Sequence, residues 1–328
     1  MKHITEQQRY TISAMKKHGY SNTEIAKIIG KNKSSVGREL KRNSDKRDGV
    51  YKAELAQRKA HGRHKNKTKR LKFTSEVKAY VEKKIKDDWS PEEISGRAKL
   101  DRVNCVSHEC IYQYIWQNKR NGGELYLHLR RHGKKYRKRG SLKDSRGIIK
   151  NRISIDERPE IVKEKNRFGD LEIDTVIGKN HKGALLTIND RFTSLVWIRR
   201  LEGKHAEPLI KKTIEALMPM KVLLHTITGD NGKEFAGHQQ IAKELNLDFY
   251  FAHPYHSWER GANENTNGLI RQYFPKGSSF ENITDKQVAY VQNKLNNRPR
   301  KRLGYLSPVE YFYKFVRNKL NQKVAFVS

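Results

Sequence analysis

Residues 169–178 read GDLEIDTVIG and decide the fold of the chain. Apolar and polar side chains alternate along this stretch, which is typical of a β-strand with one face on a core. Two short apolar runs follow, at residues 184–190 (ALLTIND) and 194–201 (SLVWIRRL), with turn signals between them. The sequence therefore predicts three consecutive strands, and the first of them carries an aspartate, Asp174.

Helices and strands alternate along the rest of the chain. We expect a helix over residues 204–217, a buried strand over 222–228 (VLLHTIT), a helix from about 234, a strand over 248–252 (DFYFA), a helix that carries residue 264, and a helix over 285–297. This order of elements is that of a ribonuclease-H-like domain. It predicts an α/β domain with a mixed five-stranded sheet over residues 161–328, behind helical domains at the N-terminus.

Three acidic residues stand on separate elements of this domain. Asp174 lies on the first strand, Asp230 follows the strand at 222–228, and Glu264 opens a helix, with 33 residues between the last two. In the expected order, the first strand pairs beside the strand that ends at Asp230, and Glu264 reaches across from its helix. Three such carboxylates can hold two Mg²⁺ ions for phosphoryl transfer on a phosphodiester.

Each acid also has a simpler interpretation. Asp230 with the Asn-Gly pair that follows it is typical of a turn, and Glu264 is a favourable first-turn acid of a helix. Asp174 is harder to explain in this way, because an aspartate inside an apolar strand needs a partner or a metal. Glu172 lies on the same face of the strand and is the main rival for the first ligand.

The composition indicates a polyanionic partner. The chain of 328 residues has 69 Lys and Arg against 36 Asp and Glu, a net charge of +33. This excess favours nucleic acid, because neutralised phosphates release condensed counterions; a ribosomal or merely basic protein is the alternative. No apolar stretch approaches the roughly 18 residues of a membrane span, and the N-terminus lacks the apolar region of a signal peptide. We therefore expect a cytoplasmic protein with no membrane partner.

The two cysteines, Cys105 and Cys110, argue against a disulfide scaffold. A zinc site with His108, His128 or His132 is one alternative, but the spacing matches no strong zinc template. The favoured interpretation is that both cysteines are small buried apolar residues.

The first 57 residues are expected to form a DNA-binding domain of the helix-turn-helix type. A helix is predicted over residues 5–18, a second is capped by Ser21 with Glu24 completing a capping box, and a third covers 33–41. The apolar stripe of the second helix is formed by Ile25, Ile28 and Ile29. The outward face of the third helix carries donors for base edges and phosphates: Ser34, Ser35, Arg38 and Arg42. An ordinary three-helix bundle with a solvated basic face is the alternative.

A second helical domain is expected over residues 74–127. Ser90, Pro91 and Glu93 are typical of a helix start, and Ser107 caps the helix after it. On that last helix several residues face outward, for contact with DNA or with a partner subunit: His108, Tyr112 and Gln113. Basic linkers are expected at residues 58–73 and 128–160. The second linker contains basic residues that we expect to grip DNA, among them Arg137, Lys138 and Arg139.

Further residues near the acids fit a DNA-handling site. Asn267 and Arg271 share a helix face with Glu264, and Lys276 follows that helix, so all three are candidates for contact with phosphate or base. The loop before the helix offers side chains that can stack on or bond to an unpaired DNA end: His253, Tyr255, His256 and Trp258. For Trp258 a place in the core is the favoured alternative.

At these residues the chain resembles the DDE transposases of the insertion sequence thirty family and, more loosely, the retroviral integrases. The segments that carry the resemblance are GDLEIDTV (169–176), TGDNGKEF (228–235), PYHSWERGANENTNGLIRQYFPKG (254–277), NNRPRKRLGYLSPVEYF (296–312) and, after the helix-turn-helix, GRELKRN (37–43). The resemblance covers nearly the whole chain and is most specific over 168–312. One departure is Leu171, where family members often carry tryptophan; it leaves the three acids intact.

The resemblance implies an insertion-element transposase whose acid triad is Asp174, Asp230 and Glu264, with two Mg²⁺ ions as cofactors and Mn²⁺ as their substitute. It implies binding to the terminal inverted repeats and to target DNA, in a bacterial cytoplasm and near the nucleoid. Because two element ends must be held together, a homodimer or a larger assembly on DNA is expected. Two alternatives stay open: a transcriptional regulator that only binds DNA, and a structure-selective nuclease without joining activity.

Overall fold

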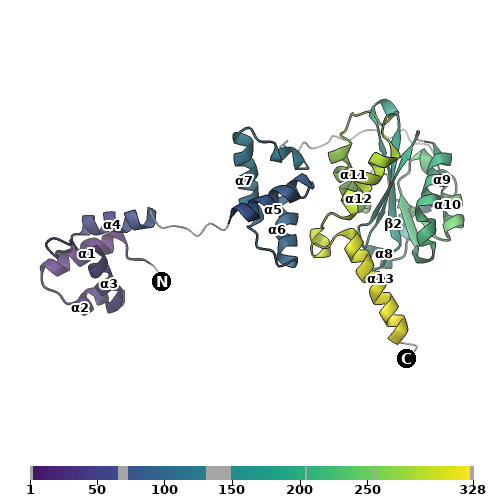
Figure 1. Cartoon of the computed structure of the whole chain (residues 1–328). Coiled ribbons are helices and arrows are strands. Elements are labelled where there is room, and N and C mark those ends of the chain that lie inside the picture. Colours follow the sequence, from purple (N-terminus) through teal and green to yellow (C-terminus); the bar gives the residue numbers. More distant parts are fainter. Residues whose placement is uncertain (1–2, 66–72, 131–148, 204, 255, 326–328) are drawn as a thin grey trace. The chain divides into compact units, whose positions relative to one another are not determined.

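The computed structural model describes residues 3–65, 73–130, 149–203, 205–254 and 256–325 (Figure 1). The chain divides into two compact units, Met1–Leu71 and Lys72–Ser328. The first unit is helical, whereas the second contains helices and a mixed sheet. In the described ranges no helix is both long enough and apolar enough to cross a membrane.

The first unit is a small helical bundle. Its helices in the described ranges are α1 (Glu6–Lys17), α2 (Asn22–Ile28), α3 (Lys33–Asn43) and α4 (Ala53–Lys65). Ile12, Ile25 and Val36, one from each of the first three helices, have no exposed surface. Ser21 and Glu24 form the capping box at the start of α2. The three helices expected from the sequence are therefore confirmed, and so is the cap.

Two details of this unit differ from the expectation. Ile28, assigned to the apolar stripe of α2, is 63% exposed. The buried face of this segment is formed by Ile25, Ala26 and Ile29, and Ile28 lies outside it. Residues 58–65, expected as the start of a basic linker, continue α4. Lys59 Nζ donates to the carbonyl of Ser44 at 2.7 Å, which ties this part of α4 to the end of α3. The rest of that expected linker, apart from residue 73, lies outside the described residues.

The second unit begins with a helical part. Its helices are α5 (Ser75–Lys86), α6 (Pro91–Leu100) and α7 (His108–Arg120), followed by the 3₁₀ turn η1 (Leu125–His128). Ser90 and Glu93 form the expected capping box of α6, and Ser107 caps α7. These helices share one core, in which Val81 and Ile111 are fully buried.

Cys105 and Cys110 are free thiols that pack, half-buried, against this core. Burial raises the pKa of the Cys105 thiol, as apolar surroundings do. Among the described residues neither cysteine belongs to a group of side chains that could hold a metal ion, and His132 lies outside those residues. Their role as small apolar residues fits the structure, although their burial is partial rather than complete.

The sheet of the second unit has the order β1-β6-β5-β2-β3-β4 in the described part of the chain. Its strands are β1 (Ile153–Ser154), β2 (Asp170–Ile177), β3 (Ala184–Asp190), β4 (Val196–Leu201), β5 (Thr226–Gly229) and β6 (Asp248–Phe251). β2, β3 and β4 are antiparallel neighbours, whereas β5 and β6 run parallel to β2. This order confirms the ribonuclease-H-like arrangement. The sheet is six-stranded rather than five-stranded, because the short β1 pairs with the outer edge of β6.

Helices cover both faces of this sheet (Figure 1). The helices α9 (Ala206–Leu217) and α10 (His238–Leu245) pack on one face, and α11 (Gly261–Tyr273) and α12 (Asp285–Asn296) pack on the other. Successive side chains of a strand point to opposite faces, so the neighbours Leu185 and Leu186 of β3 belong to the two different cores. The remaining elements are α8 (Ile161–Glu164), α13 (Pro308–Ala325) and the 3₁₀ turns η2 (Ile155–Glu157), η3 (Lys179–His181), η4 (Met218–Leu223), η5 (Lys233–Phe235), η6 (Ser257–Arg260) and η7 (Lys301–Leu303).

The strand expected at residues 222–228 is shorter than predicted. Residues Met218–Leu223 form η4 instead, and the side chain of Val222 is 90% exposed. Pro219 lies in this turn; it has a fixed φ and no N–H, so it favours a turn over a sheet ladder. β5 therefore begins at Thr226, but it still ends directly before Asp230.

Ion pairs join the helical part of the second unit to the part that contains the sheet. Arg298 Nε lies 2.9 Å from Glu93 Oε2, so the glutamate that caps α6 also holds a residue of the C-terminal region. Arg97 binds both carboxylate oxygens of Glu310, at 2.6 and 2.8 Å. Bidentate pairs of this kind fix orientation as well as proximity.

Candidate active site

Two of the three predicted acids lie on neighbouring strands: Asp174 is inside β2, and Asp230 directly follows β5. β2 and β5 pair in parallel, with Glu172 opposite Thr228, and Asp174 and Asp230 each lie two residues further along their chains. The parallel register therefore brings the two aspartates to the same edge of the sheet. Their side chains are 21% and 26% exposed, which leaves both carboxylates accessible to a small ion.

Arg260 connects the two aspartates. Its Nη1 lies 3.5 Å from Asp174 Oδ2, and its Nη2 lies 3.6 Å from Asp230 Oδ2. Neither distance is that of a short hydrogen bond, so the guanidinium acts mainly as a positive charge between two negative ones. Two carboxylates that converge on one cation supply the hard oxygen donors that Mg²⁺ prefers. The residues present therefore fit a divalent metal ion.

The carboxyl of Asp174 has an unusual environment. Its pKa is raised to about 6, mainly by burial and also by the nearby Asp230, although Arg260 and the hydrogen bonds from Thr175 and Asn267 act to lower it. A carboxylate that is costly to ionise here needs a positive charge close by. Arg260 supplies part of that charge, and a bound metal ion would supply more.

Asn267 holds Asp174 in position. Its Nδ2 donates to Asp174 Oδ2 at 2.8 Å, and its Oδ1 accepts from the hydroxyl of Thr187 at 3.2 Å. The backbone N–H of Thr175 donates to the other carboxylate oxygen at 2.8 Å. We expected Asn267 to contact DNA, but the structure places its amide against Asp174. Asn267 is therefore a positioning residue for the acid.

Replacement of Asn267 by alanine should weaken metal binding while DNA affinity stays unchanged. Loss of a side chain that orients a metal ligand lowers metal affinity by about ten- to a hundredfold. Mn²⁺ binding, followed by electron paramagnetic resonance, measures the effect, with the exposed Asn293→Ala as the control. If DNA affinity falls and Mn²⁺ affinity does not, Asn267 contacts DNA as the sequence suggested.

Glu264 lies in the first turn of α11, as expected, and its side chain is exposed. Glu264 precedes Asn267 by three residues, so these two share a face of α11, and Arg260 ends the turn η6 four residues before Glu264. Both of those neighbours contact Asp174. Among the described contacts none joins Glu264 itself to either aspartate, so its place in the triad stays a prediction.

The other two acids of β2 have partners of their own. Glu172 is 1% exposed; its Oε1 lies 3.2 Å from Arg191 Nε, and its Oε2 accepts from the backbone N–H of Asn263 at 3.0 Å. Asp170 is held by Arg167 at 2.7 Å. Glu172 shares the strand face with Asp174 but is already committed to a buried ion pair. The geometry therefore favours Asp174 over Glu172 as the first ligand.

The remaining predicted DNA contacts fall into several environments. Ser34, Arg38 and Arg42 are exposed on α3, and Ser35 is half-buried there. Gln113 is exposed on α7, whereas Tyr112 is half-buried and lines a cleft within the second unit. Lys276 is exposed after α11, and Arg137, Lys138 and Arg139 lie outside the described residues.

Arg271 points back to the sheet. Its Nη2 donates to the carbonyl of Ile177 at 2.9 Å, and its guanidinium lies 5.4 Å from the ring centre of Phe280. This packing anchors the end of α11 on β2. The prediction that Arg271 contacts DNA rests only on the helix face that it shares with Glu264. It does not account for the contacts of Arg271 with Ile177 and Phe280.

The loop before α11 has features that the sequence did not reveal. Trp258 is 68% exposed and stacks on His256 with 4.4 Å between ring centres, so its expected place in the core is wrong. His253, His256 and Glu259 offer ligand atoms within 4.8 Å of one another. Arg260 was also missed as a site residue. Its spacing of four residues from Glu264 was the signal that could have found it.

The chain is similar to known proteins in sequence and in structure. Residues 1–43 match a family described as a helix-turn-helix domain. The chain is 57% identical to the transposase for insertion sequence element IS4351 of Bacteroides fragilis, over 100% of this chain and 99% of that protein. It is 33% identical to the transposase InsI for insertion sequence element IS30A of Escherichia coli (strain K12), over 94% of this chain and 82% of that protein.

Among solved structures, the catalytic core domain of BIV integrase is similar at 16% identity and a TM-score of 0.36. The match covers 46% of this chain and 97% of that one. Strand order and register define the fold independently of this likeness.

Proposed function

Because the chain belongs to the insertion sequence thirty (IS30) family of transposases, we propose that Asp174, Asp230 and Glu264 form the metal-binding triad of its DNA strand-transfer site. The protein is a transposase of an insertion element. The proposal concerns which residues do the chemistry, which metal they hold and which DNA they act on.

The observation that carries the proposal is the convergence of Asp174 and Asp230 on the single cation of Arg260. An arrangement that already draws a positive charge between two carboxylates is suited to divalent metal. Glu264 lies in the chain between Arg260, the last residue of η6, and Asn267 of α11, and both of these contact Asp174, which supports Glu264 as the third ligand. Two Mg²⁺ ions, with Mn²⁺ as a substitute, are the cofactors that this donor set favours.

The residues around the triad have different roles in the proposed reaction. When bound, the two ions would stabilise the charge on the attacking and leaving oxygens of a phosphodiester. Asn267 and the N–H of Thr175 keep the Asp174 carboxylate oriented before DNA arrives. If metal took the place of Arg260 between the aspartates, the guanidinium would be free to neutralise a phosphate oxygen.

DNA recognition is assigned to the helical parts of the chain. In this proposal α3 enters the major groove at the terminal inverted repeats, with Ser34, Ser35, Arg38 and Arg42 toward the DNA. Target DNA is held at the triad. A homodimer or larger assembly brings two element ends together, and the mass of the complex on paired ends would show the number of subunits.

Removal of metal should stop both reactions without releasing the DNA. We expect end-containing DNA to be nicked and joined to target in Mg²⁺, and to be bound but unchanged after addition of EDTA. Restored Mg²⁺ or Mn²⁺ should restore activity, because the carboxylates alone cannot stabilise the transition state. Gel analysis of labelled ends measures both steps.

The same assay separates the alternatives. A transcriptional regulator would bind the ends in every metal and cut none of them. A nuclease without joining activity would cut the ends but leave precleaved ends unjoined to target DNA. Either result would replace the proposed strand-transfer activity.

A further inference from the structure

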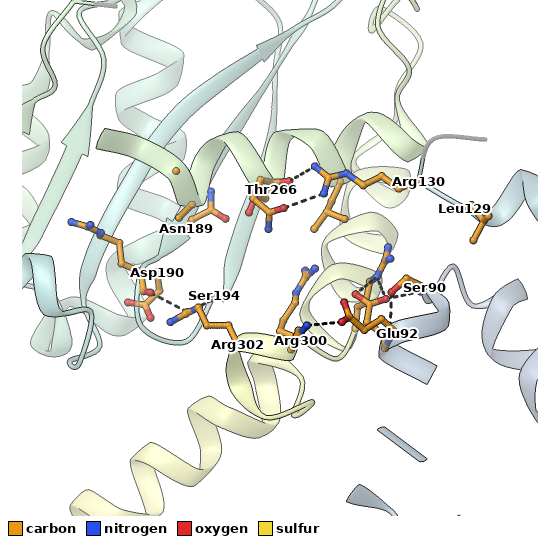
Figure 2. Close-up of a pocket in the computed structure, with 18 of the residues that line it drawn as sticks. Ser90, Glu92, Leu129, Arg130, Asn189, Asp190, Ser194, Thr266, Arg300 and Arg302 are labelled. Atoms are coloured by element: carbon orange, nitrogen blue, oxygen red, sulfur yellow. Dashed lines mark hydrogen bonds and ion pairs between the residues drawn. The ribbon is translucent and has the colours of Figure 1, made fainter. Parts of the chain in front are cut away.

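A basic cleft of about 840 Å³ lies on the second unit, on a face of α11 different from the one that carries Glu264. Its walls come from α6, α7, the end of β3, α11 and the turn η7. α11 contributes Gly261, Ala262, Asn265, Thr266 and Leu269. Figure 2 shows Asp190 and Arg302 at one end of the cleft, and Ser90 and Glu92 at the other. Clefts of this size are in the range that encloses small ligands.

The charge of the cleft is strongly positive. Seven Lys or Arg side chains line it against three acids, Glu92, Glu93 and Asp190. Each acid has its own partners: Glu93 binds Arg298, Glu92 binds Lys301 at 2.6 Å, and Asp190 accepts from the N–H and hydroxyl of Thr193. These three acids are therefore engaged elsewhere. Arg191 has its counter-charge in Glu172, whereas Arg300 and Lys165 have no ion pair in the described part of the chain.

Two of these cations are unusually short of acceptors. The Arg191 side chain is 6% exposed, and among the described residues its Nη1 has no hydrogen-bond partner. Arg300 donates from Nη2 to the carbonyl of Leu295 at 3.0 Å, while its Nε has no partner in the described part of the chain. Burial of guanidinium N–H groups without an acceptor is costly. An anion in the cleft would remove that cost.

Aromatic surface lies beside the cations. Trp116 is 38% exposed on α7, and Tyr112 precedes it by one helical turn on the same face. Both residues line the cleft. Exposed aromatic rings next to cations are the combination that binds single-stranded nucleic acid, because bases stack while phosphates are neutralised. A free inorganic anion would make no use of the aromatic rings.

The cleft begins where the carboxylate site ends. Arg260 touches both aspartates, and the next two residues of the chain, Gly261 and Ala262, line the cleft. Glu172, two residues before Asp174 on β2, holds the cleft residue Arg191 and accepts from the N–H of Asn263 in α11. The cleft and the carboxylate site are therefore built on neighbouring residues of β2 and α11.

We propose that this cleft binds a single strand of DNA next to the active site, with phosphates on Arg191 and Arg300 and a base on Trp116. The inference rests on the proposed function, since it assumes that DNA strands are parted at the acids. Neither the helix-turn-helix match nor the acid triad requires such a site.

Photocrosslinking locates the strand on the full chain. A short single-stranded oligonucleotide that contains iodouridine is bound without metal, irradiated, and the attached peptide is identified by mass spectrometry. The expected product carries the oligonucleotide on Trp116 or Tyr112. Crosslinks confined to other aromatic residues, such as Trp258, would overturn the proposal. The test uses no metal and no cleavable end, so a wrong triad would not alter its outcome.

A matched pair of lysine variants tests the charge of the cleft. Lys165 lines it, whereas Lys221 lies on η4, and both are exposed. Lys165→Gln should weaken single-strand binding more than Lys221→Gln does. It should also reduce the steepness of the plot of log binding constant against log salt concentration by about 0.7, the contribution of one phosphate contact on a single strand. Trp116→Ala should weaken the same binding about fivefold or more. Equal effects of the two lysine variants, or a change only in subunit assembly, would contradict a DNA strand in the cleft.

Discussion

Asp230→Asn is expected to abolish DNA cleavage and joining while it leaves DNA affinity nearly unchanged. The amide keeps the size of the side chain but removes the negative charge that holds metal beside Asp174. Loss of several kcal/mol of transition-state stabilisation lowers the rate by at least about a thousandfold. Cleavage of labelled ends in Mg²⁺ measures the rate, and fluorescence anisotropy measures the affinity.

A control and a companion variant make this result specific. Asp285→Asn removes the same charge from an exposed first-turn acid of α12 and should leave the rate unchanged. Glu264→Gln should behave like Asp230→Asn if Glu264 completes the triad. Full activity of the Glu264 variant beside an inactive Asp230 variant would show that another residue is the third ligand. Strand transfer by the Asp230 variant would contradict the assignment of Asp174, Asp230 and Glu264 as the metal-binding triad.

Glu172→Gln is expected to destabilise the second unit rather than to act on the metal. The change leaves the guanidinium of Arg191 buried without its counter-charge, since the two side chains are 1% and 6% exposed. Breaking a buried pair from one side costs about 3–5 kcal/mol of unfolding free energy. Urea unfolding followed by circular dichroism measures this loss, and Mn²⁺ affinity of the folded fraction should remain near that of the wild type.

A double variant distinguishes an ion pair from a metal ligand. Glu172→Met with Arg191→Met removes both charges together, so much of the lost stability should return. The opposite pattern, with stability kept and Mn²⁺ affinity lost in Glu172→Gln, would make Glu172 a ligand. In that case Glu172, rather than Asp174, would be the candidate for the first metal ligand.

Glu172 and Asp174 are two residues apart on one strand face, and the sequence could not distinguish their roles. The period of two places Glu172 and Asp174 on the same side of β2. Their difference comes from partners distant in the chain: Arg191 and Asn263 for Glu172, and Arg260 and Asn267 for Asp174. No local pattern records which acid receives which partner.

Other differences have local causes. The apolar run at residues 222–228 predicts a strand longer than β5, because the run includes residues of η4, the turn that contains Pro219. The exposed Ile28 was placed in the core because a stripe was drawn without the small Ala26. Trp258 was given a buried place because of its residue type, yet it lies on a loop and stacks on His256.

The sequence by itself determined the order of helices and strands, the helix caps, the positive charge and the presence of acids on separate elements. These properties depend on neighbours within a few residues, where periodicity and capping chemistry act. Only the tertiary structure decided that Arg260 stands between Asp174 and Asp230, that Asn267 serves Asp174, and that a basic cleft runs along α11. Such contacts join side chains from separate elements, and their geometry is fixed by packing rather than by any local pattern.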